Sequence, residues 1–216
     1  MVRHWAVTGA TLAVLCGAAP LGAQTYDWQY RWYWGAKGGL LSYNLPTPGQ
    51  VFVPQVGGEW LITARRSALY VGFSQTWSSP ELDAFTIDGQ SGGPFDLTFD
   101  GMRRLQIGVV VFPTSGTLQP YLGGGFVIET LMNVQVASGS PSTAEEQAIS
   151  DASSGGFGLI IGGVQMRMGR KLALYAQYQG SPQGRDFLLR GSAHSFEAGI
   201  RYAFLPSRED DVTTRR

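Results

Sequence analysis

The final strand-like stretch of the chain, residues 196–204, alternates between apolar residues and small or charged ones. Its apolar set is Phe196, Ala198, Ile200, Tyr202 and Phe204, and the residues between them are Glu197, Gly199, Arg201 and Ala203. Because successive side chains of a strand point to opposite faces, one face suits hydrocarbon and the other suits a polar interior. A half-buried strand of a soluble protein alternates in the same way, so the rest of the chain decides between the two.

The first 23 residues have the order of an export signal. Arg3 and His4 form a short basic start, an apolar run extends from Trp5 to Leu15, and small residues lead to Ala23. Such a run is too short to span a bilayer well. We therefore expect residues 1–23 to be a signal peptide that is cleaved near Ala23, and an uncleaved membrane anchor is the alternative.

The composition of the remaining chain favours a β protein and excludes several kinds of site. The leader contains the only cysteine, Cys16, so the mature chain has no disulfide and no Cys-based metal site. The formal net charge of +0 argues against nucleic acid as a partner. The 30 glycines are about twice the average usage, and they lie among Val, Ile, Leu, Tyr and Phe in alternating runs.

Eight stretches have the residue pattern of strands, and turn residues separate them. They lie at about 31–43, 51–65, 68–77, a fourth that ends in 105–112, 120–128, 156–168, 171–179 and 196–204. The links after the second, fourth and sixth stretches are tight, and those after the third, fifth and seventh are long and polar. An even number of roughly ten-residue strands with short turns at one end and long loops at the other is typical of outer-membrane barrels.

The sequence therefore predicts an all-β fold, an eight-stranded antiparallel up-and-down transmembrane β-barrel over residues 24–204. Residues 143–152, in one long loop, could form a short helix. They lack the apolar stripe of a core helix, and we interpret them as an excursion of the loop at most.

Three segments carry a resemblance to a known family. They are the Pro-Tyr-Leu-Gly-Gly-Gly run at 120–125, the stretch 163–178, and the Tyr-Ala-Phe ending at 202–204. In these the chain resembles the small outer-membrane barrels of the OmpA/OmpX-like or opacity-like type. The resemblance implies that barrel-assembly machinery reads the final strand, with Ile200, Tyr202 and Phe204 as the signal. The chain departs from the family in its charged tail, residues 205–216, which we expect to be a disordered periplasmic extension.

Five charged residues fall on the inferred inward face: Lys37, Glu59, Arg104, Glu197 and Arg201. The interior of an eight-stranded barrel is just wide enough to be filled by side chains, and charges buried there must be paired. Since the first and last strands are neighbours in a closed barrel, we expect Glu197 to meet Lys37 and Arg201 to meet Glu59. This arrangement predicts a packed polar plug, with a narrow or gated ion path as the alternative.

Aromatic residues gather toward the two ends of the expected strands. Trp32, Trp34, Phe112, Tyr202 and Phe204 lie at the end with short turns, and Trp77 lies at the other. Such rings concentrate at both membrane interfaces, so we interpret Trp32, Trp34, Trp77 and Phe112 as interface anchors. A sugar-binding platform is the alternative.

Nothing in the sequence identifies catalytic, cofactor or metal-binding residues. The only histidine after the leader, His194, lies beside Ser195, and adjacent strand residues point to opposite faces, which disfavours a nucleophile–base pair. No phosphate-cradling or dinucleotide motif is present. The long loops are acidic, which suits either a solvated rim or the binding of divalent cations or a basic partner.

We therefore expect a monomeric, non-enzymatic protein of a bacterial outer membrane, with both termini periplasmic and without a cofactor. Its partners would be outer-membrane lipids including lipopolysaccharide and, during insertion, the barrel-assembly machinery. Its role would be structural or a surface interaction such as adhesion through the long loops. A soluble, lipocalin-like ligand carrier with reversed faces is the main alternative. A narrow ion channel and a lipid A-modifying enzyme are further ones.

Overall fold

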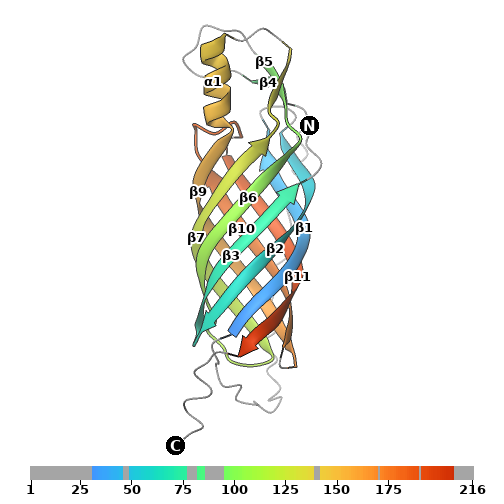
Figure 1. Cartoon of the computed structure of the whole chain (residues 1–216), viewed down its shortest axis with the longest axis vertical. Helices are drawn as coiled ribbons and strands as arrows, with labels where there is room; N and C mark the ends of the chain where they lie inside the picture. The colour runs from blue at the N-terminus through green and yellow to red at the C-terminus, as the bar shows by residue number, and fades with distance from the viewer. Residues whose placement is uncertain are drawn as a thin grey trace, which may run out of the picture.

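Eight strands of the computed structural model close into an antiparallel barrel, in the order β1-β11-β10-β9-β7-β6-β3-β2 (Figure 1). The structure describes residues 31–45, 49–76, 82–85, 95–138, 142–169, 171–189 and 191–206. The barrel strands are β1 (Arg31–Asn44), β2 (Gln50–Ala64), β3 (Ser67–Thr76), β6 (Gly101–Val111), β7 (Leu118–Met132), β9 (Ser154–Met168), β10 (Leu172–Gln183) and β11 (Gly191–Pro206). The predicted fold class is confirmed.

The first and last strands close the barrel as expected. β1 pairs with β11 from Arg31↔Pro206 to Ser42↔His194, and Lys37 lies opposite Gly199. The predicted strands at 171–179 and 196–204 were too short, because Ser181↔Ala193 and Gln183↔Gly191 continue the β10–β11 ladder. This extension satisfies backbone groups that a loop would leave to solvent.

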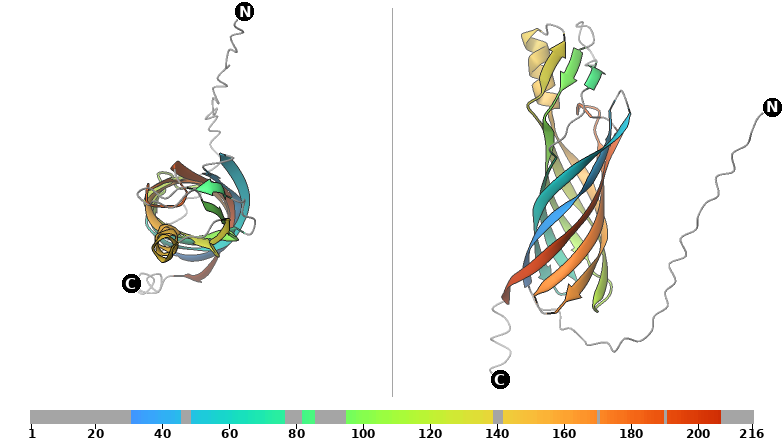
Figure 2. Two further views of the ribbon diagram at one scale, coloured as in Figure 1. Left: turned by 90° about the horizontal axis from the view of Figure 1, so that it is seen from above. Right: turned by 90° about the vertical axis from the view of Figure 1, so that its right-hand side faces the viewer.

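A second, smaller unit lies at the long-loop end of the barrel (Figure 2). It comprises a three-stranded sheet in the order β4-β5-β8 and one helix, α1 (Thr143–Ala152). The three strands are β4 (Leu82–Phe85), β5 (Phe95–Thr98) and β8 (Gln135–Ser138). Within the described residues, no helix is long and apolar enough to cross a membrane.

Residues 143–152 form the short helix that the sequence allowed, and this helix packs on the barrel, which makes it more than an excursion of the loop. Ser142 and Glu145 make a reciprocal capping box at the start of α1, which satisfies two backbone N–H groups that a helix start leaves open. Ile149 is buried in the apolar cluster at the mouth of the barrel, and Ala152 packs against the same cluster. These two residues dock the helix, although it lacks the apolar stripe of a core helix.

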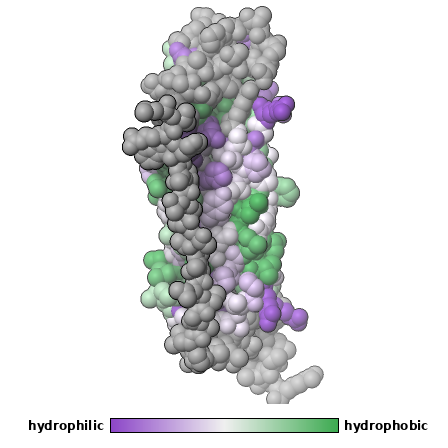
Figure 3. Space-filling model, turned by 180° about the vertical axis from the view of Figure 1, so that it is seen from behind, coloured by the Kyte–Doolittle hydropathy of each residue, from purple (hydrophilic) through white to green (hydrophobic). Residues whose placement is uncertain are grey.

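The barrel turns its apolar face outward. Along β6, for example, Leu105, Ile107 and Val109 are exposed, whereas Arg104 and Gln106 are fully buried. In the view of Figure 3, hydrophobic side chains lie along the wall of the barrel. The lipocalin-like alternative required Trp34, Ile62, Ile200 and Phe204 to line a cavity. Trp34, Ile200 and Phe204 instead lie on the outside with half or more of their surface exposed.

Two apolar clusters close the interior. The first lies at the long-loop end and includes Tyr43, Met102 and Leu131 from the strands together with Phe187, Leu188 and Leu189 from the β10–β11 loop. The second lies toward the short-turn end and includes Tyr33, Leu61, Val110, Phe112 and Ala203. Most of the buried polar and charged side chains of the strands lie between these two clusters.

Several predictions concern residues outside those that the structure describes. They are the signal peptide at residues 1–23, the interface anchor Trp77, and the tail from residue 207 onward. The predicted tail began at residue 205, but β11 continues to Pro206.

Candidate functional site

The structure places all five charged residues of the predicted network inside the barrel. Lys37, Glu59, Arg104, Glu197 and Arg201 are each 5% exposed or less. They come from β1, β2, β6 and β11, and each occupies a position whose strand neighbours point outward. The two-residue periodicity of the strands is therefore what directs these charges inward.

Glu197 is the centre of the network. Its carboxylate lies 3.1 Å from Lys37 Nζ, and it accepts hydrogen bonds from the side-chain amides of Gln177 (2.6 Å) and Gln179 (3.1 Å). Lys37 Nζ also donates to the Tyr70 hydroxyl at 3.0 Å and to Gln106 Oε1 at 3.1 Å. These contacts join β1, β3, β6, β10 and β11, so one carboxylate and one ammonium connect most of the barrel wall.

Arg201 forms the second group, nearer the short-turn end. Its Nε donates to Glu59, and its Nη1 donates to Gln165 Oε1 at 2.8 Å. The guanidinium carbon lies 3.8 Å from the centre of the Tyr175 ring, which adds a cation–π contact. The structure thus brings together the two pairs named from the sequence, Lys37 with Glu197 and Arg201 with Glu59.

A third ion pair includes a residue that the sequence interpretation missed. Arg104 Nε donates to Glu129 Oε1 at 3.0 Å, and both side chains are fully buried. Glu129 also accepts from Ser181 (3.2 Å) and Gln183 (2.8 Å). The predicted fifth strand ended at residue 128. Tyr121 and Val127 point inward, and extending that strand by one residue would have placed Glu129 on the same inward face.

The aromatic residues at the short-turn end divide between the two faces of the wall. Trp32 and Trp34 are 43% and 54% exposed and both contact Trp60, with ring centres 5.3 and 5.5 Å apart. Phe112 is fully buried inside the barrel, where its ring lies 5.4 Å from that of Tyr121. Its interpretation as an interface anchor was wrong. Phe112 lies an even number of residues after Arg104 and therefore points to the same, inward face.

The proposed assembly residues Ile200, Tyr202 and Phe204 all point outward on β11. They are 50%, 40% and 61% exposed, and the rings of Tyr202 and Phe204 pack edge to face at 5.0 Å. Lys171, at the β9–β10 turn, places its ammonium 6.0 Å from the Tyr202 ring centre. A cation beside exposed rings is the chemistry of a membrane–water boundary.

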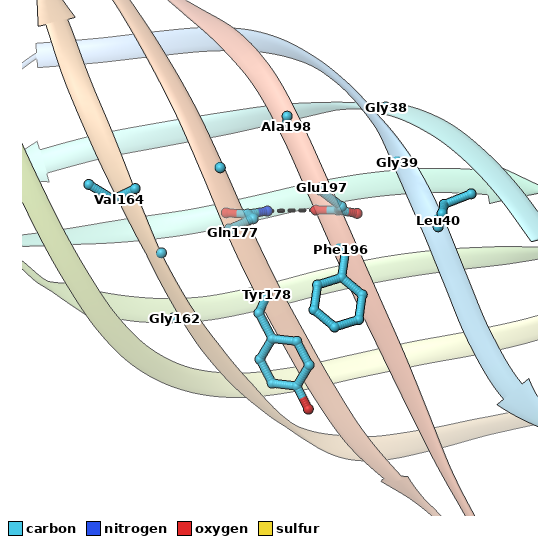
Figure 4. Close-up of a pocket in the computed structure, with 12 residues that line it drawn as sticks. Gly38, Gly39, Leu40, Gly162, Val164, Gln177, Tyr178, Phe196, Glu197 and Ala198 are labelled. Atoms are coloured by element: carbon cyan, nitrogen blue, oxygen red, sulfur yellow. Dashed lines mark hydrogen bonds between the residues drawn. The ribbon is translucent and has the colours of Figure 1, made fainter. Parts of the chain in front are cut away.

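A shallow groove crosses the outer wall over β1, β11, β10 and β9 (Figure 4). Its floor consists of small residues that are direct cross-strand partners, Gly38 with Ala198 and Ala198 with Ala176. Larger side chains border it, and the rings of Phe196 and Tyr178 lie side by side there, 5.2 Å apart. Because these side chains point away from the interior, the groove belongs to the apolar outer surface.

A short chain of hydrogen bonds lies beside this groove toward the long-loop end. The Tyr178 hydroxyl lies 2.7 Å from His194 Nδ1, and Ser192 Oγ lies 2.8 Å from His194 Nε2. Ser195 is buried inside the barrel and bonds to Gln55. Sequence reasoning considered Ser195 and missed Ser192, which shares the outward face of His194 because it lies two residues away.

No arrangement of metal ligands is present among the described residues. No group of three or more His, Cys, Asp or Glu side chains lies close enough together to hold an ion in that part of the chain.

Comparison with known proteins identifies the architecture. No family model matches the chain, and no curated protein matches it. The crystal structure of Neisserial surface protein A is similar, with a TM-score of 0.57 and 12% identity over 80% of this chain and 97% of that one. The N-terminal β-barrel domain of OprF from Pseudomonas aeruginosa is similar with a TM-score of 0.51 and 9% identity, over 82% and 99% of the two chains. The chain therefore has the fold of the small eight-stranded outer-membrane barrels.

Proposed function

We propose that the protein is a non-enzymatic barrel of a bacterial outer membrane that acts at the cell surface through its long-loop end. The outward apolar wall would face lipid, including lipopolysaccharide on the outer side. The short turns and both termini would be periplasmic. The observation that carries the proposal is the ordered unit of α1 and the β4-β5-β8 sheet, which is built on a barrel whose interior is closed.

The unit at the long-loop end is well anchored for binding. Leu97 from β5 and Ile149 from α1 are buried in the same apolar cluster as Leu131 and Leu188. The backbone N–H of Leu188 donates to the carbonyl of Ala152 at 3.0 Å. Loops that are fixed in this way lose less conformational entropy on binding than loose ones, which favours a recognition role.

The closed interior supports this role over conduction. Lys37, Arg104 and Arg201 are each paired with a carboxylate, so the described interior holds no charge that would attract ions of one sign. Apolar side chains cover the polar centre at both ends. An ion path would require both apolar clusters to open.

The Ser192–His194 pair requires its own test, because a serine beside a histidine can act as a nucleophile. In this structure the other ring nitrogen of His194 bonds to Tyr178, a neutral phenol rather than a carboxylate. We propose that these groups bind lipid head groups or water. Treatment with a fluorophosphonate should leave Ser192 unlabelled, and specific labelling that His194→Ala abolishes would contradict the non-enzymatic proposal.

The surface role is tested by replacing residues 133–153 with a short Gly-Ser linker. The outer-membrane fraction should still contain a barrel that migrates faster on a gel before boiling than after. Cells that display the variant should lose adhesion to surfaces that wild-type cells bind. Unchanged adhesion with a folded barrel would contradict the role of this end, and recovery of the wild-type protein outside the membrane fraction would contradict the location.

A further inference from the structure

The edge strand β8 borders a cleft at the tip of the molecule. In the sheet order β4-β5-β8, the outer strand β8 pairs with β5 alone among the described residues. Its other edge lines a cleft of about 590 Å³ whose opposite wall is α1. Gln135 and Val136 of β8 line this cleft, together with Asn133 and Val134, which precede the strand. The cleft therefore lies along the start of the strand at the edge of the described sheet.

The helix presents one face to the same cleft. Glu146, Ile149, Ser150 and Ser153 line it, with the spacing of three and four residues that places side chains on one side of a helix. Val134 and Val136, which are partly buried, supply apolar surface, and Glu146 supplies a single charge. The cleft is thus bounded on one side by β8, which pairs with β5 alone among the described residues, and on the other by a mostly uncharged helix face.

We propose that this cleft binds an extended peptide segment of a partner protein as an additional strand on β8. An unpaired edge offers N–H and C=O groups at the spacing that only another extended backbone matches. The partner segment would carry apolar side chains toward Val134 and Val136 and a lysine or arginine toward Glu146. The inference rests on the proposed surface role and names the class of partner.

The register of β8 limits the length of such a segment. Leu97 pairs with Val136 and Asp96 with Ser138, so Ala137 is an extra residue in a bulge. A bulge bends the strand and interrupts regular pairing beyond it. The added strand therefore runs along Val134–Val136 and spans about four residues, roughly 13 Å of chain. Binding through so few pairs depends strongly on the side chains of the helix wall.

The support behind the cleft is rigid enough to hold a ligand. Val134 and Val136 pack against the apolar cluster that contains Leu97 and Leu131. The capping box fixes the start of α1, and Leu131 N–H donates to the carbonyl of Ser153 at 2.8 Å at its end. Both walls are thus held by the same apolar cluster, which also contains Ile149 of α1.

The test uses the full mature protein in detergent micelles and a random heptapeptide library displayed on beads. The expected result is enrichment of peptides that combine β-branched residues with lysine or arginine. Two variants should weaken binding of an enriched peptide about tenfold or more, a difference that titration resolves readily. Ser150→Trp fills the cleft, and Glu146→Lys reverses its charge.

Matched controls lie on the same helix. Gln147→Trp and Asp151→Lys make the same changes at exposed residues that do not line the cleft, and they should bind like wild type. N-methylation of the peptide backbone should abolish binding at alternate positions only, because alternate residues of an added strand face β8. The proposal would be overturned if the cleft variants and the control variants lost peptide binding equally. It would also be overturned if N-methylation affected binding without alternating along the peptide.

Failure of this inference is distinguishable from failure of the proposed function. If no peptide is enriched over the Ser150→Trp protein while the replacement of residues 133–153 still abolishes adhesion, strand addition is wrong and the surface role stands. If adhesion survives that replacement, the surface role of this end is wrong whatever the peptides do.

Discussion

The buried pair Lys37–Glu197 allows the interior network to be tested quantitatively. Lys37→Met removes the ammonium and leaves the carboxylate of Glu197 at 4% exposure without its counter-ion. Loss of one partner from a buried pair costs about 3–5 kcal/mol. Because Gln177 and Gln179 still donate to the carboxylate, we expect the low end, about 3 kcal/mol.

Glu197→Gln should cost at least as much. It leaves the Lys37 ammonium with two neutral acceptors, the Tyr70 hydroxyl and Gln106 Oε1. It also places a new amide NH₂ beside the amides of Gln177 and Gln179, which donate to the carboxylate of Glu197 in the wild type. We expect a loss of about 3–5 kcal/mol from the uncompensated buried charge.

The double variant, Lys37→Met with Glu197→Gln, removes both charges. What remains is mainly the cost of a buried neutral amide, about 1–3 kcal/mol. The double variant should therefore be no less stable than either single one, with an interaction free energy of about 3 kcal/mol or more, at or above the upper end for residues in contact.

The assay is urea unfolding of the protein in detergent micelles, followed by tryptophan fluorescence and by the gel mobility of unheated samples. Arg103→Met is the control. Arg103 is exposed on the outer face, where its Nε donates to Gln75, so its loss should change the free energy of unfolding by about 0.5 kcal/mol or less. Additive single effects, or single variants as stable as the control, would refute the view that Glu197 and Lys37 stabilise each other.

Four further predictions follow from the structure. In Gly57→Ala the new Cβ would lie 1.9 Å from the Phe73 carbonyl oxygen, so the barrel should not fold. In Gly58→Ala the nearest atom would lie 3.5 Å away, so this variant should keep the fast-migrating band of the unheated sample. Equal folding of the two variants would contradict this prediction. Leu188 is fully buried in the apolar cluster at the long-loop end, and Leu188→Ala should lower the free energy of unfolding by about 2–5 kcal/mol in the urea assay. A smaller change than that of the Arg103→Met control would show that this cluster is loosely packed. Purified wild-type protein should give no large single-channel conductance in planar bilayers, and stable conductance would contradict the sealed interior. The fluorescence of Trp34 should be quenched more by lipids brominated near the head group than by lipids brominated at the chain end. The reverse order of quenching would contradict its position at the interface.

The alternation of inward and outward side chains predicted most of the barrel from the sequence. The errors arose where this alternation was not followed to the end of a strand. Lys37, Glu59 and Arg201 were placed by alternation, and the structure has them inside. Phe112 ends a continuous apolar run, Val109-Val110-Val111-Phe112, in which composition does not distinguish the two faces. Counting in steps of two from Arg104 gives the inward position that the structure shows.

The unit at the long-loop end could not be predicted in the same way. The β4-β5-β8 sheet joins segments that are more than 30 residues apart, and its four-residue strands carry almost no periodic signal. Ile149 is buried only because the mouth of the barrel offers it an apolar surface, which is a tertiary effect. The start of α1 was accessible from sequence, since Ser142 and Glu145 have the spacing of a capping box.

The paired charges inside the barrel indicate what a polar interior contributes to folding. The described strands bury three cations and three carboxylates, and each cation has its carboxylate within hydrogen-bonding distance. Apolar residues of similar volume could stabilise the fold equally well. Polar interior positions have another effect, because they make each strand apolar on one face only. A strand with two apolar faces could insert with either face toward lipid, whereas Glu197 and Arg201 allow β11 only one orientation and one register. On this argument the network specifies how the barrel closes, and the Lys37 and Glu197 single variants should yield misfolded as well as less stable protein.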